Sequence, residues 1–133
     1  MTTKVRSINF SPDEWLAGTV ALGVVDKGCF WTVCALIYSH GGPIDDDPIW
    51  LAKNCGCDPR TWKAARQRLL DCGKLTLVGP NSAGGNGGAG GGQLTNSRCE
   101  QELYKARERM FRSRSAADLS AIRRRSFSKS HRQ

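Results

Sequence analysis

Two Asp-Pro pairs near the middle of the chain, Asp47-Pro48 and Asp58-Pro59, restrict its folding more than any other feature. An aspartate directly ahead of a helix accepts hydrogen bonds from the first backbone N–H groups, which have no partner within the helix. A proline is well tolerated at the first helical position, because its missing N–H would have had no partner there. Each pair therefore predicts the start of a helix.

Glycines stand where these two helices should end. Gly56 and Gly73 are placed to adopt the left-handed conformation that commonly follows the last helical turn. The starts and stops together predict a short helix over 48–54, a tight turn over 55–58 and a longer helix over 59–72. That order is typical of a helix-turn-helix.

The predicted helix 59–72 has two faces. At about 100° per residue, its apolar arc contains Trp62, Ala65, Leu69 and Leu70. Outside that arc lie Arg60, Lys63, Ala64, Gln67 and Arg68. Arg66 lies at the edge, where we expect its guanidinium to extend into solvent. Such cations and amides bind phosphates and base edges in a major groove, although a solvated amphipathic helix has the same pattern.

A β-hairpin is predicted after this helix. Residues 74–79 and 93–96 have the composition of short strands, and we expect the glycine-rich run 80–92 between them to be mobile. A hairpin over 74–96 directly after a helix-turn-helix is the order of a winged helix. We therefore predict a mainly α winged helix-turn-helix domain over 1–112.

Two further helices are predicted upstream. Ser11 and Glu14 fit a capping box, and Phe10 and Trp15 fit a hydrophobic staple, for a helix that ends near Gly18.

The second upstream helix, 26–40, should begin at Asp26 and form the centre of the core. Apolar residues cover most of its circumference, namely Phe30, Trp31, Val33, Cys34, Leu36, Ile37 and Tyr38. We expect Trp15, Trp50 and Trp62 to pack on it, with a base-stacking platform as the alternative role for these aromatic rings.

The sequence predicts no metal or cofactor. Four cysteines could in principle gather around zinc, namely Cys55, Cys57, Cys72 and Cys99, but the chain has no C-x-x-C and no histidine at ligand spacing. Cys29 and Cys34 fit small core residues. The run of three aspartates lacks the alternating spacing of a calcium loop, so Asp45 and Asp46 are predicted to be solvated loop charges.

A closing helix is predicted over 97–111, and a basic, largely disordered tail over 113–133. The closing helix carries a narrow apolar stripe that consists of Cys99, Leu103, Ala106 and Met110. We expect this stripe to pack back on the domain, with a homodimer through helix 97–111 as the alternative.

Most of the excess positive charge lies at the C-terminal end. Residues 1–97 hold nine Lys/Arg and eight Asp/Glu, whereas residues 98–133 hold eleven and four, so the net charge of +8 divides into +1 and +7. Arg123, Arg124 and Arg125, with Lys129 and Arg132, would add salt-dependent affinity for phosphates. A tail that only improves solubility is the alternative.

Several classes of protein are disfavoured. The longest apolar stretch, within 29–38, is too short to cross a bilayer and has no signal-like flanks, which predicts a cytoplasmic protein without membrane contact. We expect no enzyme, because His40 and His131 stand apart from any nucleophile or carboxylate pair that could support catalysis.

The chain resembles the YdaU-like family of phages and prophages. The residues that carry the resemblance are Asp13 to Thr19, Gly28, Trp31, Leu36 to Tyr38, Gly41 to Ile44, Trp50 to Ala52, Trp62, Gly73-Lys74 and Leu94 to Leu103. The family has no agreed biochemical function or catalytic residues, and it is commonly encoded among replication genes. The resemblance implies a role in DNA replication initiation inside a bacterial host cell. The start at Val24 to Lys27 and the glycine-rich wing tip depart from the family pattern.

Two hypotheses follow for function. The first is a DNA-binding winged helix whose contacts are Arg60, Lys63, Gln67, Arg68, Lys74, Arg123, Arg124 and Arg125. The second is an adaptor that binds a replicative helicase or loader and contacts DNA only secondarily, since a fold alone does not decide function. A transcriptional regulator is a variant of the first hypothesis.

Overall fold

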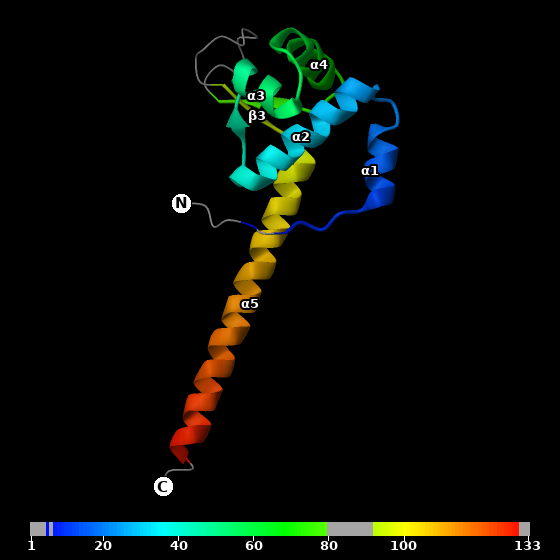
Figure 1. The fold of residues 1–133 in the computed structure, drawn as a ribbon. Helices are drawn as coiled ribbons and strands as arrows, with labels where there is room; N and C mark the ends of the chain where they lie inside the picture. The colour runs from blue at the N-terminus through cyan, green and yellow to red at the C-terminus, as the bar shows by residue number, and fades with distance from the viewer. Residues whose placement is uncertain (1–4, 6, 80–91, 131–133) are drawn as a thin grey trace.

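The structure is a computed structural model that describes residues 5, 7–79 and 92–130, with side chains described as far as residue 126. The glycine-rich tip of the predicted hairpin therefore falls almost wholly outside the described residues. The elements are α1 (Pro12–Thr19), α2 (Val24–His40), β1 (Ile44–Asp45), α3 (Pro48–Cys55), α4 (Pro59–Asp71), β2 (Thr76–Val78), β3 (Gln93–Thr95) and α5 (Ser97–Ser130). Figure 1 shows five helices around this small sheet, with α5 projecting away from the rest.

The three strands form one antiparallel sheet in the order β1-β3-β2. Leu94 in the central strand pairs with Leu77 on one side and with Ile44 on the other. The predicted hairpin is confirmed as β2 and β3. The strand β1 was not predicted from the sequence, because two residues are too few to show an alternating pattern. The fold is thus mainly α with a small antiparallel sheet.

Local capping fixes α3 and α4 as the sequence predicted. The Asp47 carboxylate accepts hydrogen bonds from the backbone N–H groups of Ile49 (3.1 Å) and Trp50 (3.3 Å). The Asp58 carboxylate accepts one from the N–H of Thr61 at 2.7 Å. The following glycines, Gly56 and Gly73, have φ values of 76° and 78°, which side chains other than glycine rarely tolerate.

The start of α1 differs from the prediction in one respect. Ser11 is the N-cap residue but makes no side-chain capping hydrogen bond. Glu14 forms an ion pair with Arg98 of α5 instead of closing a capping box. The hydrophobic staple does form, with the rings of Phe10 and Trp15 6.3 Å apart.

The core is built around α2, as predicted. Its buried residues include Phe30, Val33 and Ile37, and Trp62 of α4 is fully buried. The ring of Trp15 stacks on that of Phe30 at 5.3 Å. The structure corrects the prediction for two residues, because Trp31 is 51% exposed and Trp50 is 40% exposed.

Trp50 faces outward because its neighbours set the rotation of α3. Leu51 and Ala52 are both buried, so the inward face of α3 lies at those positions and away from Trp50.

The helix α2 begins two residues earlier than expected. Its N-cap residue is Gly23 and its first residue is Val24, so Asp26 belongs to the first turn instead of preceding it. Asp26 is free to bind elsewhere, and its partner lies on α4.

The last helix, α5, is much longer than the predicted 97–111. It continues through Ser130, across the segment 113–130 for which the sequence predicted little order. The residues from 93 onward include no glycine or proline, and alanine, leucine and arginine are good helix formers. Within the described residues, no helix has both the length and the apolar character needed to cross a bilayer.

The first turns of α5 pack against the body of the molecule. Cys99, Leu103 and Ala106 are buried, and Met110 is partly buried against the core. This stripe therefore packs back on the domain, which is the first of the two predicted arrangements. The residues from Phe111 to Ser120 are all exposed.

Candidate nucleic-acid interface

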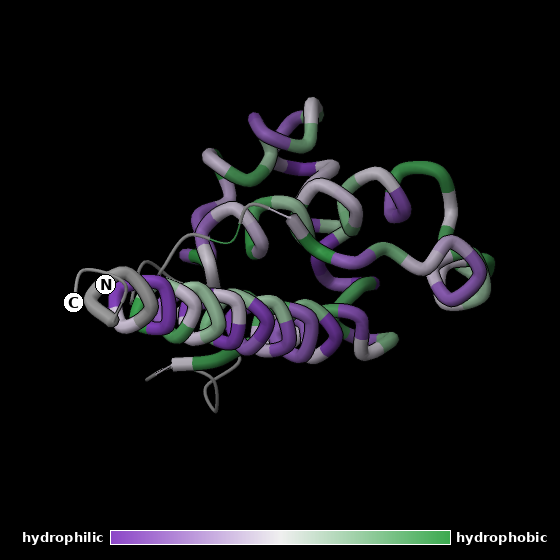
Figure 2. Tube along the Cα trace, turned by 90° about the horizontal axis from the view of Figure 1, so that it is seen from below, coloured by the Kyte–Doolittle hydropathy of each residue, from purple (hydrophilic) through white to green (hydrophobic). Residues whose placement is uncertain are grey.

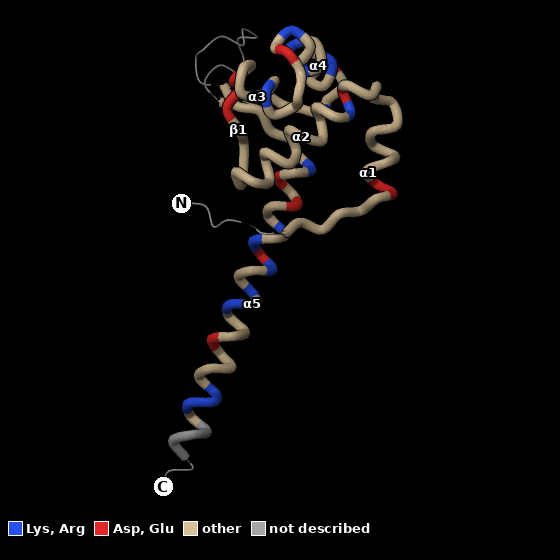
Figure 3. Tube along the Cα trace, viewed as in Figure 1, with Lys and Arg blue, Asp and Glu red and all other residues tan. Residues whose placement is uncertain are grey.

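The outer face of α4 is determined by its buried side chains. Trp62, Ala65 and Leu69 are completely buried, which fixes the rotation of the helix about its axis. The residues on the outer side are all exposed and comprise Arg60, Lys63, Ala64 and Gln67. Figure 3 shows the positive residues of α4 at the end of the molecule opposite the tip of α5.

Arg68 is exposed as well, with 55% of its side chain open to solvent, but it is bound by a carboxylate of another helix. Its Nε donates to Oδ2 of Asp26 at 2.8 Å, and its Nη2 donates to Oδ1 of the same carboxylate at 2.7 Å. Hydrogen bonding to Asp26 raises the pKa of Arg68. The guanidinium is thus bound edge-on by a carboxylate of α2. Sequence reasoning missed this pair because the two residues are far apart in the chain.

Arg66 and Asp46 form a second bidentate ion pair, which corrects two predictions. The Arg66 Nε donates to Oδ1 of Asp46 at 3.0 Å, and its Nη2 donates to Oδ2 at 2.5 Å. The exposed fractions of the two side chains are only 14% and 7%. Arg66 therefore does not extend into solvent, and Asp46 is not a solvated loop charge. The pair fixes α4 to the end of β1.

Gln67 and Lys74 are also less free than the sequence suggests. The amide of Gln67 donates to Asp71 at 2.8 Å, so contact with a base would require this exchangeable bond to open. Lys74 is half-buried, and its Nζ lies 3.5 Å from where a Cβ on Gly18 would stand. Lys74 therefore points toward α1, away from the outer face of α4.

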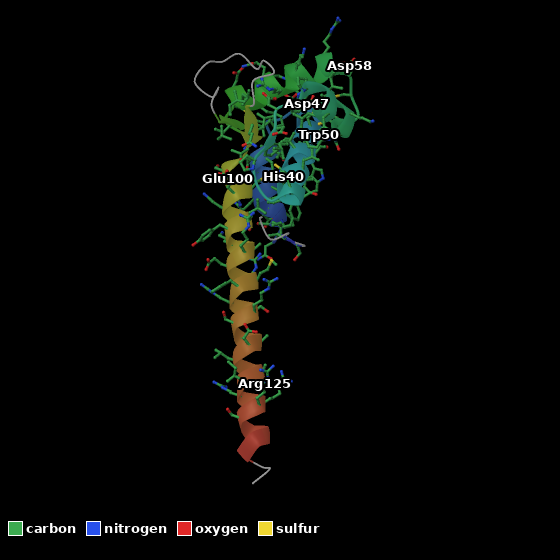
Figure 4. All side chains as sticks on the ribbon, turned by 90° about the vertical axis from the view of Figure 1, so that its left-hand side faces the viewer. His40, Asp47, Trp50, Asp58, Glu100 and Arg125 are labelled. Carbon is green, nitrogen blue, oxygen red and sulfur yellow. The ribbon has the colours of Figure 1, made fainter. Side chains whose placement is uncertain are left out.

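The three arginines of the predicted tail lie on α5, far from α4. Arg123, Arg124 and Arg125 are exposed on its projecting part. Figure 4 labels Asp58, at the start of α4, and Arg125 at opposite ends of the molecule. The predicted contacts therefore form two separate cationic surfaces, one on α4 and one on α5.

A pocket of about 280 Å³ lies between α1, α2 and the first turn of α5, and the sequence analysis did not identify it. Its lining includes Trp15, Tyr38, Cys34, Cys99, Lys74 and Arg98. Arg98 binds Glu14 on one side and Glu102 on the other, the latter at 3.2 Å. The charged groups of the pocket thus neutralise one another, which gives it no preference for an anion.

The pKa values of two buried thiols in this pocket shift in opposite directions. Hydrogen bonding with Cys99 and burial raise the pKa of Cys34. Hydrogen bonding from Cys34 and then from Tyr38 lowers the pKa of Cys99. No sequence pattern could have indicated this pair, because its members lie on helices that meet only in the folded chain.

The four cysteines considered for zinc do not come together. Cys99 lies against Cys34, whereas Cys55 and Cys57 lie beside Cys29, and Cys72 is exposed. The described residues hold no group of three or more His, Cys, Asp or Glu side chains that could bind a metal ion. The aspartate run is divided as well, since Asp47 caps α3 and Asp46 binds Arg66.

Comparison with known proteins adds no assignment. No protein-family model, no curated protein and no solved structure matches the chain. The resemblance to the YdaU-like family stays a prediction from the sequence.

Proposed function

We propose that the protein is a DNA-binding winged helix of phage or prophage origin that acts in replication initiation. The observation that carries the proposal is the arrangement of α3, α4 and the β2–β3 hairpin. A capped helix, a tight turn and a second helix with an exposed polar face are followed by an antiparallel hairpin, and β1 ties that hairpin to the helices. Helix-turn-helix proteins insert the second helix of such a unit into the major groove.

Contacts to DNA would divide between the two cationic surfaces. On α4, Arg60 and Lys63 have no ion-pair partner among the described residues, and they would bind phosphates or guanine edges. On the projecting part of α5, residues 112–126 hold five arginines and one aspartate, a net charge of +4. That charge would add affinity that does not depend on DNA sequence and weakens with salt.

A binding experiment with four proteins tests the proposal. Affinities for duplex and single-stranded DNA are measured across salt for the intact chain, a chain truncated at residue 112, Arg60→Ala/Lys63→Ala and Lys105→Ala/Arg109→Ala. The last is the matched control, because it removes two exposed cations from the packed part of α5. We expect the α4 variant to lose sequence selectivity, the truncation to lose mainly salt-dependent affinity, and the control to bind like the intact chain.

Two results would show that α4 does not recognise DNA sequence. If the truncation abolishes all binding, and Arg60→Ala/Lys63→Ala behaves like its control, DNA contact resides in α5 alone. Binding of the intact chain that is equally tight on every duplex would also contradict the role of α4.

The adaptor is the second candidate, and one observation favours it. Of the four basic residues of α4, Arg66 and Arg68 are bound by aspartates. Only Arg60 and Lys63 then remain on α4 as cations without an ion-pair partner among the described residues. In this case the protein would bind a helicase or loader of the host or phage, and the α4 variant would leave DNA binding unchanged. A transcriptional regulator would share the DNA contacts of the first candidate.

A further inference from the structure

The projecting part of α5 contains a short repeat. Phe111 and Ile122 are eleven residues apart, and so are Arg112 and Arg123, and Arg114 and Arg125. Eleven residues make about three turns of an α-helix, so residues related by this repeat lie on one face. Hydrophobic and hydrophilic residues accordingly alternate in bands along the projecting α5 in Figure 2.

The apolar members of this face are open to solvent. They form a stripe, here called the outer stripe, that consists of Tyr104, Phe111, Leu119 and Ile122, whose exposed fractions are 66%, 70%, 58% and 58%. At about 100° per residue the four lie within an arc of about 80°. They point nearly opposite to Cys99, Leu103 and Ala106, which pack on the body. The described part of the molecule leaves the outer stripe uncovered.

Arginines border the outer stripe on both sides. Arg112 and Arg123 follow one edge, and Arg114 and Arg125 follow the other, at about 100° and about 300° when Phe111 is taken as 0°. Two carboxylates lie on the same face, Asp118 at about 340° and Glu108 at about 60°, so the charged residues along the stripe sum to +2. An apolar seam with charged residues along both edges is how helices that pair with another helix select their partner. The edge charges set the partner's chemistry, since like charges across such a seam repel.

A second copy of the chain does not satisfy these edges. Asp118 and Glu108 of each copy could pair with at most two arginines of the other, which leaves two of the four arginines on each copy without a carboxylate. A nucleic acid would bind the arginines but would leave Phe111 and Ile122 in water. A helix with an apolar stripe bordered by glutamate or aspartate covers the apolar residues and pairs with all four arginines.

We propose that the outer stripe of α5 binds an acidic amphipathic helix of a partner protein, with the four bordering arginines paired to its carboxylates. The inference goes beyond the proposed function and shares with it only the arginines of α5, because it involves neither α4 nor the hairpin. Its failure would leave DNA binding by α4 untouched.

Synthetic helices of about three heptads test this chemistry directly. One carries leucine at its a and d positions and glutamate at e and g; the second has lysine in place of the glutamates, and the third has serine in place of the leucines. Fluorescence anisotropy with the full chain should detect binding of the glutamate peptide alone. The lysine and serine peptides should bind at least about tenfold more weakly.

Variants of the full chain then locate the binding surface. Phe111→Ser/Ile122→Ser and Arg112→Gln/Arg123→Gln should each weaken binding of the glutamate peptide by about tenfold or more. Arg109→Gln/Arg124→Gln removes two exposed cations away from the stripe and should bind like the unaltered chain. Circular dichroism of each variant verifies that its helix content is unchanged, and a helix-neutral pair, Phe111→Ala/Ile122→Ala, replaces the serine pair if it is not.

Several results would overturn the proposal. Equal binding of the lysine peptide, loss of affinity in the Arg109/Arg124 control, or no binding of the glutamate peptide would each do so. If sedimentation shows that the chain self-associates, and Phe111→Ser/Ile122→Ser abolishes this self-association, the outer stripe binds a second copy instead. In cells, a photo-crosslinking phenylalanine analogue at position 111 should label acidic helical segments, and labelling confined to nucleic acid would contradict the proposal.

Discussion

Arg66 and Arg68 stand two residues apart on α4 and bind carboxylates from different elements. Arg66 binds Asp46 at the end of β1, and Arg68 binds Asp26 in the first turn of α2. Two bidentate pairs from one helix fix both its position and its rotation, because each guanidinium fork accepts one orientation of its partner. They therefore hold the outer face of α4 in place.

Removal of Asp46 should strongly destabilise the fold. Asp46→Ala leaves the guanidinium of Arg66, only 14% exposed, without its partner. Loss of one member of a buried ion pair costs roughly 3–5 kcal/mol. Urea unfolding measures the change in the free energy of unfolding, and the exposed neighbour Asp45→Ala serves as control with an expected change of less than about 0.5 kcal/mol. A similar small change for both variants would show that the pair does not support the fold.

Arg68→Ala tests whether this arginine supports the fold or belongs to the proposed DNA contacts. Because Asp26 accepts hydrogen bonds from the Nε and Nη2 of Arg68, the variant should lower the midpoint of urea unfolding and leave DNA affinity at low temperature nearly unchanged. Arg60→Ala should lower DNA affinity and leave the midpoint of urea unfolding nearly unchanged. If DNA affinity falls equally in both variants and the unfolding midpoints are unaltered, Arg68 contacts DNA directly.

At the scale of elements, the cap of α4 makes stability depend on pH in the acidic range. Hydrogen bonds from the backbone and side chain of Thr61 lower the pKa of Asp58 below its ordinary value of 3.8. The unfolded chain therefore takes up this proton first as the pH falls, so the stabilisation is complete above pH 3.8 and is lost as the pH falls through the lower pKa of the folded state. Asp58→Asn keeps a capping oxygen that cannot titrate in this range.

Thermal unfolding of the unaltered chain and of Asp58→Asn, measured from about pH 6 to about pH 2, determines this contribution. The difference in melting temperature between the unaltered chain and Asp58→Asn should be constant above pH 3.8 and should become smaller below it. A difference that stays constant down to the lowest pH would mean that protonation of Asp58 does not weaken the start of α4.

The sequence predicted elements well where the determining residues are neighbours. Asp47, Asp58, Gly56 and Gly73 act on backbone groups within a few residues, and each of them ends or starts a helix as expected. Predictions that depend on distant partners were wrong, as for Arg66, since nothing near it in the chain indicates Asp46. The end of α5 was also misjudged, because helix propensity continues beyond Phe111 even though the packed stripe stops there.

At the scale of the whole molecule, α5 sets the distance between the two cationic surfaces. Arg125 lies 28 residues after Ser97, which at about 1.5 Å per residue places it about 42 Å along the helix. Figure 1 shows α4 beyond the opposite end of that helix. If one duplex contacts both surfaces, it must be long enough to reach from α4 to the arginines at 123–125.

Duplex length should therefore control how much those three arginines contribute. At about 3.4 Å per base pair, a duplex of about 10 base pairs spans about 34 Å, which is shorter than α5, and one of about 25 base pairs spans about 85 Å. We expect Arg123→Gln/Arg124→Gln/Arg125→Gln to weaken binding of the long duplex and to flatten its salt dependence by about 2.7 in the log–log slope, at 0.9 per phosphate contact. The short duplex should bind both proteins alike, with Lys27→Gln/Lys105→Gln/Arg109→Gln as the charge-matched control. Equal losses on both duplexes would mean that the end of α5 binds DNA by itself, without α4 on the same molecule.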